Sequence, residues 1–235
     1  MKQTLLGWLC VATLALGVRT EALADGMLPE TSVVVVKQAE GEASIRIRND
    51  DPGVALLLVE IQNIPEDNET LLFLTQPAWR VEAGKEQVVR FILRTDVTLT
   101  TQRLKRVVFR SVAQSKGNGD SEVGVGLQQN LPVLIHPKGL ALDRTPWTWL
   151  RWSLHDGELR VNNPSAYVVR LAQELSLLPS KHPATLARSY ILPGESLVVA
   201  RNVPNGPTLE RVRLLPATVY GNAVEAFEAP LYKLP

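Results

Sequence analysis

Short apolar runs alternate with polar residues along most of the chain, and this pattern predicts β-strands. Residues 43–48 alternate strictly between apolar and polar side chains, and residues 54–61 form a more continuous apolar run. A period of two residues is typical of a strand with one buried face. Turn-forming residues, such as Asn-Asp-Asp-Pro-Gly at 49–53, separate the runs. No helical period competes with them, so the sequence predicts an all-β fold of the immunoglobulin-like sandwich type.

The stretch at residues 123–135 is the longest of the predicted strands. At about 3.3 Å per residue it would span roughly 43 Å, which is long for a globular strand. Gly124 and Gly126 indicate the close approach of another backbone, and Pro132, which has no N–H group, predicts an edge or a bulge. An uncovered apolar edge promotes aggregation, so this is either an ordinary inner strand or one that pairs with another protein. Its alternating apolar positions are Val123, Val125, Leu127, Leu131, Val133 and Ile135.

A second set of short predicted strands follows the segment His-Pro-Lys-Gly at 136–139, which interrupts the pattern. The turn His-Asp-Gly at 155–157 lies between two apolar runs and is a good hairpin signal. We therefore expect an N-terminal immunoglobulin-like domain at 25–136 and a C-terminal β-sandwich domain at 137–235.

The first residues are typical of a cleaved export signal. Lys2 gives a positive start, residues 5–18 are apolar, and Ala-Leu-Ala at 22–24 fits a small-residue cleavage site. We expect residues 1–24 to be a signal peptide and the mature chain to start at Asp25. The only cysteine, Cys10, lies in the removed segment, so the mature chain depends on core burial rather than on a disulfide.

Charge and composition argue against several classes of function. A formal net charge of +1 gives no electrostatic basis for binding nucleic acid. The three histidines lack metal-ligand spacing, and no Gly-x-Ser-x-Gly nucleophile motif occurs. We expect no catalytic residue, no metal and no cofactor. Trp147, Trp149 and Trp152 fit core and interdomain packing better than a contact surface for a partner.

Several segments carry a family resemblance through their order and spacing. Pro-Ala-Trp-Arg-Val-Glu-Ala-Gly at 77–84 is similar to a Pro-x-x-Arg-hydrophobic-Glu-x-Gly pattern, and Asn-Pro-Ser-Ala-Tyr at 163–167 to an Asn-Pro-(Ser/Thr)-x-Tyr signature. Together the segments resemble the PapD-like periplasmic chaperones of chaperone–usher pili, over essentially the whole mature chain. They are residues 44–50, 76–90, 103–109, 159–167 and 192–195.

The resemblance implies two immunoglobulin-like domains in an L shape and a location in the periplasm. It implies pilus subunits and an outer-membrane usher as partners. The seventh strand of the chaperone would act as a donor strand, which completes the sheet of a subunit that lacks its own seventh strand. Val123, Val125 and Leu127 would then fill the subunit's open groove, and the same exposed strand could form a self-capping dimer. The alternative is a secreted two-domain β-sandwich protein that binds another ligand or acts as an adhesin.

The chain departs from the family at two positions. The resemblance implies two basic residues that anchor the terminal carboxylate of the subunit, but Ser32 and Pro132 occupy their places. Arginine binds carboxylates bidentately, so Arg106 or, as a weaker candidate, Arg103 could replace them. The remaining candidates are the hydroxyl groups of Thr31 and Ser32. The alternative for each arginine is a solvated side chain on a strand.

Overall fold

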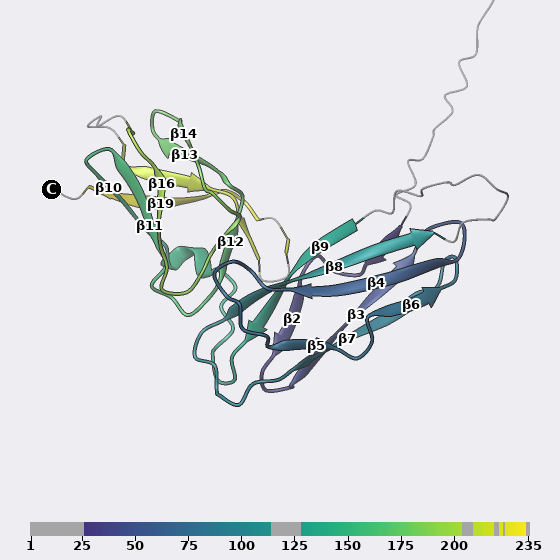
Figure 1. Ribbon diagram of the computed structural model, residues 1–235. Coiled ribbons are helices and arrows are strands. Elements are labelled where there is room, and N and C mark those ends of the chain that lie inside the picture. The colour runs from purple at the N-terminus through teal and green to yellow at the C-terminus, as the bar shows by residue number, and fades with distance from the viewer. Residues whose placement is uncertain (1–25, 114–127, 204–208, 219–220, 223, 234–235) are drawn as a thin grey trace, which may run out of the picture.

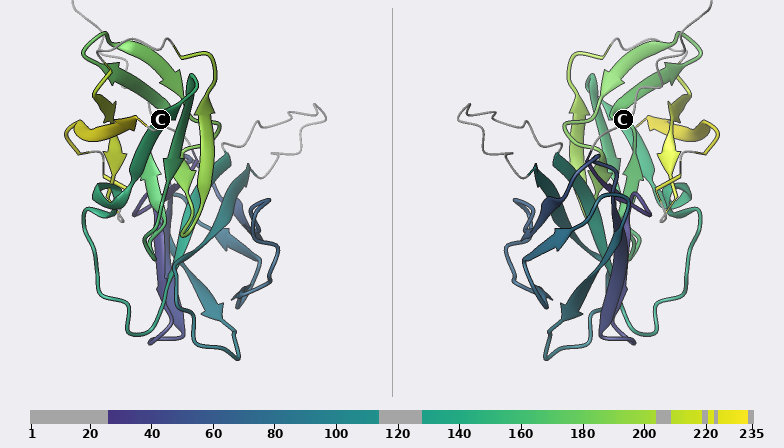
Figure 2. Two further views of the ribbon diagram at one scale, coloured as in Figure 1. Left: turned by 90° about the vertical axis from the view of Figure 1, so that its left-hand side faces the viewer. Right: turned by 90° about the vertical axis from the view of Figure 1, so that its right-hand side faces the viewer.

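The computed structural model describes residues 26–113, 128–203, 209–218, 221–222 and 224–233. It confirms the all-β fold with two immunoglobulin-like sandwiches, which form two lobes that meet at an angle (Figure 1). Views from both sides show the earlier strands in one lobe and the later strands in the other (Figure 2). Within the described ranges, no helix is long and apolar enough to cross a membrane.

The first lobe packs two sheets around one apolar core. Its four-stranded sheet has the order β1-β3-β7-β5, and its five-stranded sheet the order β2-β9-β8-β4-β6. Alternation places Ile45 and Ile47 of β3 in the core, at most 2% exposed, and leaves Arg46 and Arg48 outside. The strands are β1 (Met27–Pro29), β2 (Val34–Lys37), β3 (Glu42–Asn49), β4 (Ala55–Gln62), β5 (Leu72–Leu74), β6 (Ala78–Val81), β7 (Glu86–Leu93), β8 (Arg103–Ala113) and β9 (Gln128–His136).

The second lobe has a seven-stranded sheet, β14-β13-β17-β19-β10-β11-β16, and a three-stranded sheet, β15-β12-β18, around a second core. The short 3₁₀ helix η1 (Pro146–Trp149) precedes it. The predicted hairpin joins β10 and β11 through Asp156 and Gly157, both with positive φ. The strands are β10 (Arg151–His155), β11 (Glu158–Asn162), β12 (Val169–Leu171), β13 (Glu174–Leu178), β14 (His182–Thr185), β15 (Tyr190–Ile191), β16 (Ser196–Ala200), β17 (Arg211–Leu214), β18 (Pro216–Ala217) and β19 (Phe227–Lys233).

The three clustered tryptophans have different environments. Trp147 and Trp152 are buried in the second core, at 6% and 0% exposed. Trp149 is 54% exposed, and its Nε1 donates to Oδ2 of Asp143 at 2.8 Å. The expectation of packing is therefore wrong for Trp149, because η1 directs this side chain away from the core.

Both lobes contain the same buried corner. The side chains of Asn49, at the end of β3, and Asn163, directly after β11, are 0% exposed. Each Nδ2 group donates to two or three backbone carbonyl groups at 2.8–3.3 Å. The backbone carbonyl of each asparagine accepts a hydrogen bond from the N–H of a turn glycine at 2.8 Å. The glycine is Gly84 for Asn49 and Gly194 for Asn163. Both glycines have positive φ, which glycine adopts without strain.

Replacing Asn163 with alanine should lower the free energy of unfolding by about 2–3 kcal/mol, because buried carbonyl groups would lose their donor. Asn162→Ala is the matched control, since the Asn162 side chain bonds to Ser196 at an exposed position. Urea denaturation of both variants measures the difference. Equal losses of unfolding free energy in the two variants would show that the buried Asn163 amide stabilises the fold no more than the exposed Asn162 amide does.

A small apolar cluster and a buried glutamine join the lobes. The backbone N–H of Gln102 donates to the carbonyl oxygen of Ala166 at 2.8 Å, and its Oε1 accepts from the N–H of Val168 at 2.9 Å. The side chain of Gln102 is 3% exposed. These contacts connect the first lobe to the second. The buried members of the apolar cluster are Val33, Ile64, Leu104, Leu134 and Val168.

Candidate functional site: the cleft between the lobes

Strand β9 has a free edge along its first half. On one side it pairs with β8 from Gln128 to Ile135, in antiparallel register. On the other side it pairs with β2 only from Val133 to His136. Among the described strands, none pairs with 128–132 on that side, which agrees with the edge that Pro132 predicts. Backbone groups on an unpaired strand edge can pair with another chain.

The free edge borders a cleft of about 580 Å³ between the lobes. One wall is formed by 129–132 of β9, and another by 29–32, where the chain passes from β1 to β2. Arg106 of β8 and Arg170 and Ser189 of the second lobe complete the lining of the cleft. A hydrogen-bonding edge therefore leads directly to two guanidinium groups.

Arg106 is held in position at the end of this edge. Its Nε donates to Oδ1 of Asn130 at 2.8 Å, and its Nη2 donates to the Asn130 backbone carbonyl at 2.7 Å. Burial lowers the pKa of Arg106, although arginine stays charged at neutral pH. Arg106 forms no ion pair with a carboxylate in the described part of the chain. A planar donor without a counter-charge is suited to binding an incoming carboxylate.

Arg170 of β12 is the site residue that the sequence analysis missed. Its Nη1 atom is buried and finds no hydrogen-bond acceptor among the described residues. Burial and the positive charge of Arg106 together lower the pKa of Arg170. Alternation predicts that Arg170 lies on the opposite face from Val169 and Leu171, which are core residues. No local signal, however, indicates which residue of the first lobe it faces.

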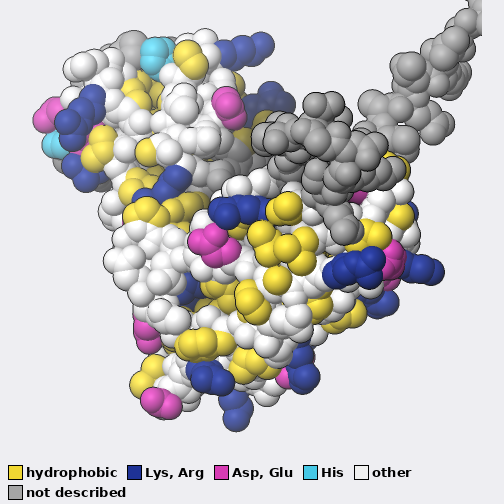
Figure 3. All heavy atoms as spheres, turned by 45° about the vertical axis from the view of Figure 1, so that its right-hand side comes forward, with side chains coloured by type: hydrophobic (Ala, Val, Ile, Leu, Met, Phe, Trp, Pro, Cys, Tyr) yellow, Lys and Arg dark blue, Asp and Glu magenta, His cyan; other side chains and the backbone are white. Residues whose placement is uncertain are grey.

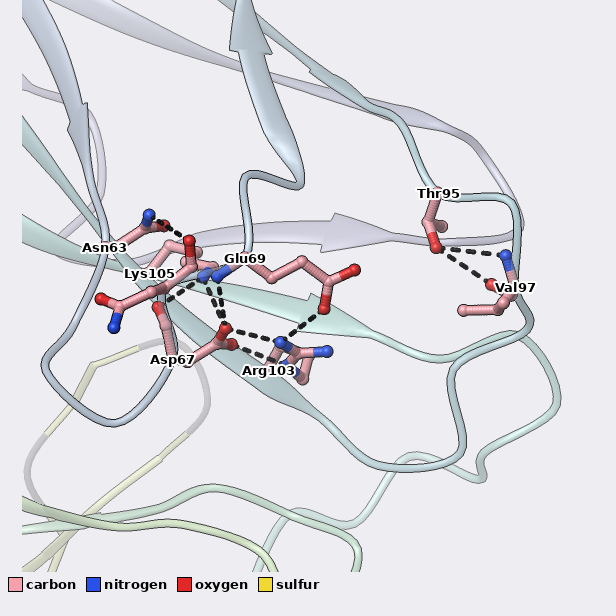
Figure 4. A network of polar contacts seen from close by, with 8 residues as sticks. Asn63, Asp67, Glu69, Thr95, Val97, Arg103 and Lys105 are labelled. Atoms are coloured by element: carbon pink, nitrogen blue, oxygen red, sulfur yellow. Dashed lines mark hydrogen bonds and ion pairs between the residues drawn. The ribbon is translucent and has the colours of Figure 1, made fainter.

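Arg103 lies in a different network. Its guanidinium binds Asp67 bidentately, at 2.6 Å and 2.5 Å, and also binds Glu69 at 2.9 Å (Figure 4). Lys105, only 1% exposed at its side chain, binds Asp67 at 2.9 Å in the same network. Arg103 does not line the cleft with Arg106. Strand alternation separates them, because residues 103 and 106 lie on opposite faces of β8.

The remaining predicted site residues have distinct positions. Thr31 and Ser32 line the cleft. The hydroxyl group of Thr31 donates to the carbonyl oxygen of Val33 at 2.9 Å, so its proton is already engaged. Val123, Val125 and Leu127 lie outside the described residues, as does the predicted signal segment 1–24.

The loop between β4 and β5 connects the Asp67 network to the second lobe. Glu66 forms an ion pair with Arg188, which also binds Glu195. The hydroxyl group of Tyr190 donates to Oε2 of Glu66 at 2.8 Å. Burial and this hydrogen bond raise the pKa of Tyr190 to about 12. These contacts position the two walls of the cleft relative to one another.

One face of the first lobe also carries exposed apolar side chains. Figure 3 shows hydrophobic side chains gathered there, with Lys and Arg side chains around them. Leu56 of β4 and Val112 of β8 are opposed across the two strands and are 39% and 46% exposed. A surface of this kind is common where another protein binds.

Comparison with known families is decisive for classification. Residues 26–141 match the family of pili and flagellar-assembly chaperones through the PapD N-terminal domain, and residues 146–227 match the C-terminal domain of the pili assembly chaperone PapD. The chain belongs to the PapD-like chaperone family. A curated relative is the uncharacterized fimbrial chaperone YhcA of Escherichia coli K12, 42% identical over 200 residues, 85% of this chain and 88% of the relative.

Solved chaperone structures have the same fold at low sequence identity. The structure of the Salmonella enterica SafA pilin in complex with the SafB chaperone matches with a TM-score of 0.72 at 16% identity, over 88% of this chain and 97% of that chain. The CupB2 chaperone of Pseudomonas aeruginosa matches with a TM-score of 0.69 at 18% identity, over 87% of this chain and 100% of that chain. These matches support the two-sandwich architecture.

Proposed function

We propose that this fimbrial chaperone captures a pilus subunit by strand addition along β9, in the periplasm, and delivers it to an outer-membrane usher. Its role is binding rather than catalysis, and its export signal is residues 1–24. The observation that carries the proposal is the free edge at 128–132, which leads to a cleft lined by two guanidinium groups.

The physical basis of the proposed capture is β-augmentation. An extended segment of the subunit would form backbone hydrogen bonds with the free edge of β9. Alternate side chains of this donor strand would occupy the subunit's groove. Leu131, Val133 and Ile135 face the core of the chaperone itself. Val123, Val125 and Leu127 have the same parity, so a continued strand would carry the apolar row beyond that core.

Purification of the tagged protein from the periplasm of cells that are assembling pili tests the proposed function. We expect a stoichiometric partner with a pilin-like sequence, identified by mass spectrometry. Repeated recovery of the chaperone without such a partner from those cells would contradict the proposal. N-terminal sequencing of the same sample tests cleavage before Asp25.

Replacing Arg106 with alanine should weaken subunit capture by about tenfold or more, because a hydrogen-bonded charge contact would be lost. Thermal unfolding should change little, since the hydrogen bonds of the side chain are to Asn130 alone. Arg110→Ala is the control, because Arg110 also donates to a β9 side chain, that of Gln128, but does not line the cleft. Unchanged capture by Arg106→Ala would leave Arg170, Thr31 and Ser32 as the remaining candidates in the lining of the cleft.

Without a subunit, the free edge of one copy would pair with that of a second copy, and we propose a self-capping dimer as the resting form. Light scattering after size-exclusion chromatography should show a dimer that converts to a chaperone–subunit heterodimer when subunit is added. A strictly monomeric chaperone at high concentration would contradict this arrangement.

A further inference from the structure

We propose that His136 is an acid-sensitive switch, which links the two domains while its imidazole is neutral and releases them when it is protonated. His136 is the last residue of β9 and lies at the start of the segment that connects the domains. Its Nδ1 atom lies 3.0 Å from Nε2 of Gln102, and its Nε2 atom lies 2.9 Å from the backbone carbonyl oxygen of Leu140. This switch acts on the domain arrangement, so it does not depend on the proposed function.

The hydrogen bonds at the two ends of this link fix where the imidazole proton lies. The backbone N–H of Val168, in the second domain, can only donate, so the atom of Gln102 that faces it at 2.9 Å is Oε1. The other end of the same amide is then Nε2, which donates to His136, so Nδ1 accepts and carries no proton. A neutral imidazole therefore has its proton on Nε2, which donates to the Leu140 carbonyl. This one tautomer satisfies every group in the chain of hydrogen bonds.

A second proton on the imidazole breaks the chain. It would lie on Nδ1 and point at the amino group of Gln102, so two donors would face each other. A half-turn of the Gln102 amide would give Nδ1 an acceptor, but it would place the amino group against the N–H of Val168. Gln102 is 3% exposed and Val168 2% exposed, so water is poorly placed to replace a lost partner. Protonation of His136 therefore costs one side-chain hydrogen bond of Gln102 in either orientation of the amide.

The charged groups around His136 do not favour its protonation. Lys37 of β2 and Lys138 of the connecting segment line the same pocket as His136, and no carboxylate of the described residues lines it. Lys37 binds Glu40 at 2.8 Å, so this acidic group is already paired. An imidazolium would share the pocket with two ammonium groups. The ionisable groups on the other packed elements are Arg103, which is bound to Asp67 and Glu69, Asp96, which lines a second pocket with Lys138, and Tyr167, which donates to the carbonyl oxygen of Ala141.

Loss of the Gln102 link would leave the domains joined but freer to change their angle. A separate contact between them, the ion pair of Glu66 with Arg188, contains no histidine. Imidazole takes up a proton around its ordinary pKa of about 6.5, so the added freedom should develop as the pH falls from neutral to mildly acid. Because the walls of the cleft belong to different domains, mild acid should also speed the release of a captured subunit, and this consequence alone rests on the proposed function.

The test uses the full mature chaperone with one cysteine introduced in each domain, Ser44→Cys and Ser180→Cys, both at exposed positions. A chain that starts at Asp25 has no other cysteine, so spin labels attach only there. Pulsed electron paramagnetic resonance gives the distribution of distances between the labels at about pH 7.5 and about pH 5, on either side of the ordinary imidazole pKa. We expect a narrow distribution at the higher pH and a broad one at the lower pH. Loss of one buried hydrogen bond should favour the released arrangement by about tenfold.

Three substitutions separate the switch from a general effect of acid. His136→Asn keeps an acceptor near the position of Nδ1 that takes up no proton in this range, so its distribution should stay narrow at both pH values. His136→Leu removes the acceptor and should give a broad distribution at both. Gln102→Glu supplies a carboxylate that accepts from an imidazolium and from the N–H of Val168 together, so acid should no longer broaden the distribution. His182→Asn, on β14, is the matched control and should behave as the wild type does.

Two results would overturn the switch. One is a wild-type distribution that does not change between the two pH values, and the other is acid broadening that persists in His136→Asn, because the titrating group would then lie elsewhere. Asp67 is not that group, since its hydrogen bonds keep its pKa below the ordinary carboxyl value. Gln102→Glu decides the question where His136→Asn does not fold. Failure of the switch leaves subunit capture to be tested by co-purification, and a working switch in a protein that captures no subunit would stand while the proposed function fails.

Discussion

Replacing Val123, Val125 and Leu127 together with serine should abolish complexes with pilus subunits and leave the melting temperature of the free chaperone nearly unchanged. Burial of each of these side chains in a subunit groove would contribute roughly 1.5–3 kcal/mol. Three of them would contribute several kcal/mol even after the cost of ordering the strand. Their loss should therefore reduce capture below detection.

Val133→Ala is the matched control for this triple variant. Val133 lies on the same strand and in the same phase, but it is 0% exposed in the core of the first domain. Its truncation should lower the free energy of unfolding by about 1–3 kcal/mol. Thermal melts and subunit co-purification measure both variants. A collapsed triple variant would show that the three side chains belong to the core, and a stable one that still holds subunit would exclude capture through them.

Replacing Asp67 with asparagine should lower the free energy of unfolding by about 3–5 kcal/mol, because it removes the counter-charge of a buried lysine. Lys105 binds the Asp67 carboxylate at 2.9 Å and the Asp67 backbone carbonyl at 2.8 Å. Arg103 binds the same carboxylate bidentately. The variant would leave two positive charges close together with only Glu69, which is half exposed, to balance them.

The same network predicts a loss of stability in acid. Desolvation opposes ionisation of Asp67, but the hydrogen bonds from Arg103 and Lys105 outweigh it and lower the pKa of this carboxyl. A folded pKa below the unfolded value gives stability that is present above the ordinary carboxyl pKa of about 3.9 and is lost as the pH falls through the folded pKa. Asp67→Asn should therefore lose less stability between neutral and acid pH than the wild type does.

Glu69→Gln is the control for the Asp67 variant. Glu69 binds the same Arg103, but its side chain is 52% exposed, so the substitution should cost less than about 1 kcal/mol. Urea denaturation at several pH values measures all three proteins. Equal destabilisation by the two substitutions, or identical acid profiles for Asp67→Asn and the wild type, would contradict the assigned role of the buried pair.

The alternating pattern determined most of the first domain. Strict alternation at 43–48 placed Ile45 and Ile47 in the core, because side chains on a strand point to opposite faces in turn. Pro132 correctly indicated an edge, since a residue without an N–H group cannot serve a central strand on both sides. The same parity rule distinguishes Arg106 from Arg103, because Val107 and Phe109 define the core face of β8.

Only the tertiary structure decided how the cleft is assembled. Arg106 and Arg170 belong to different domains, and their convergence depends on the angle that the contacts of Gln102, Glu66 and Arg188 set between the lobes. Local sequence fixes the face on which a side chain lies, since that depends on neighbouring residues alone. It does not fix which distant charge lies opposite, because that depends on packing between elements far apart in the chain.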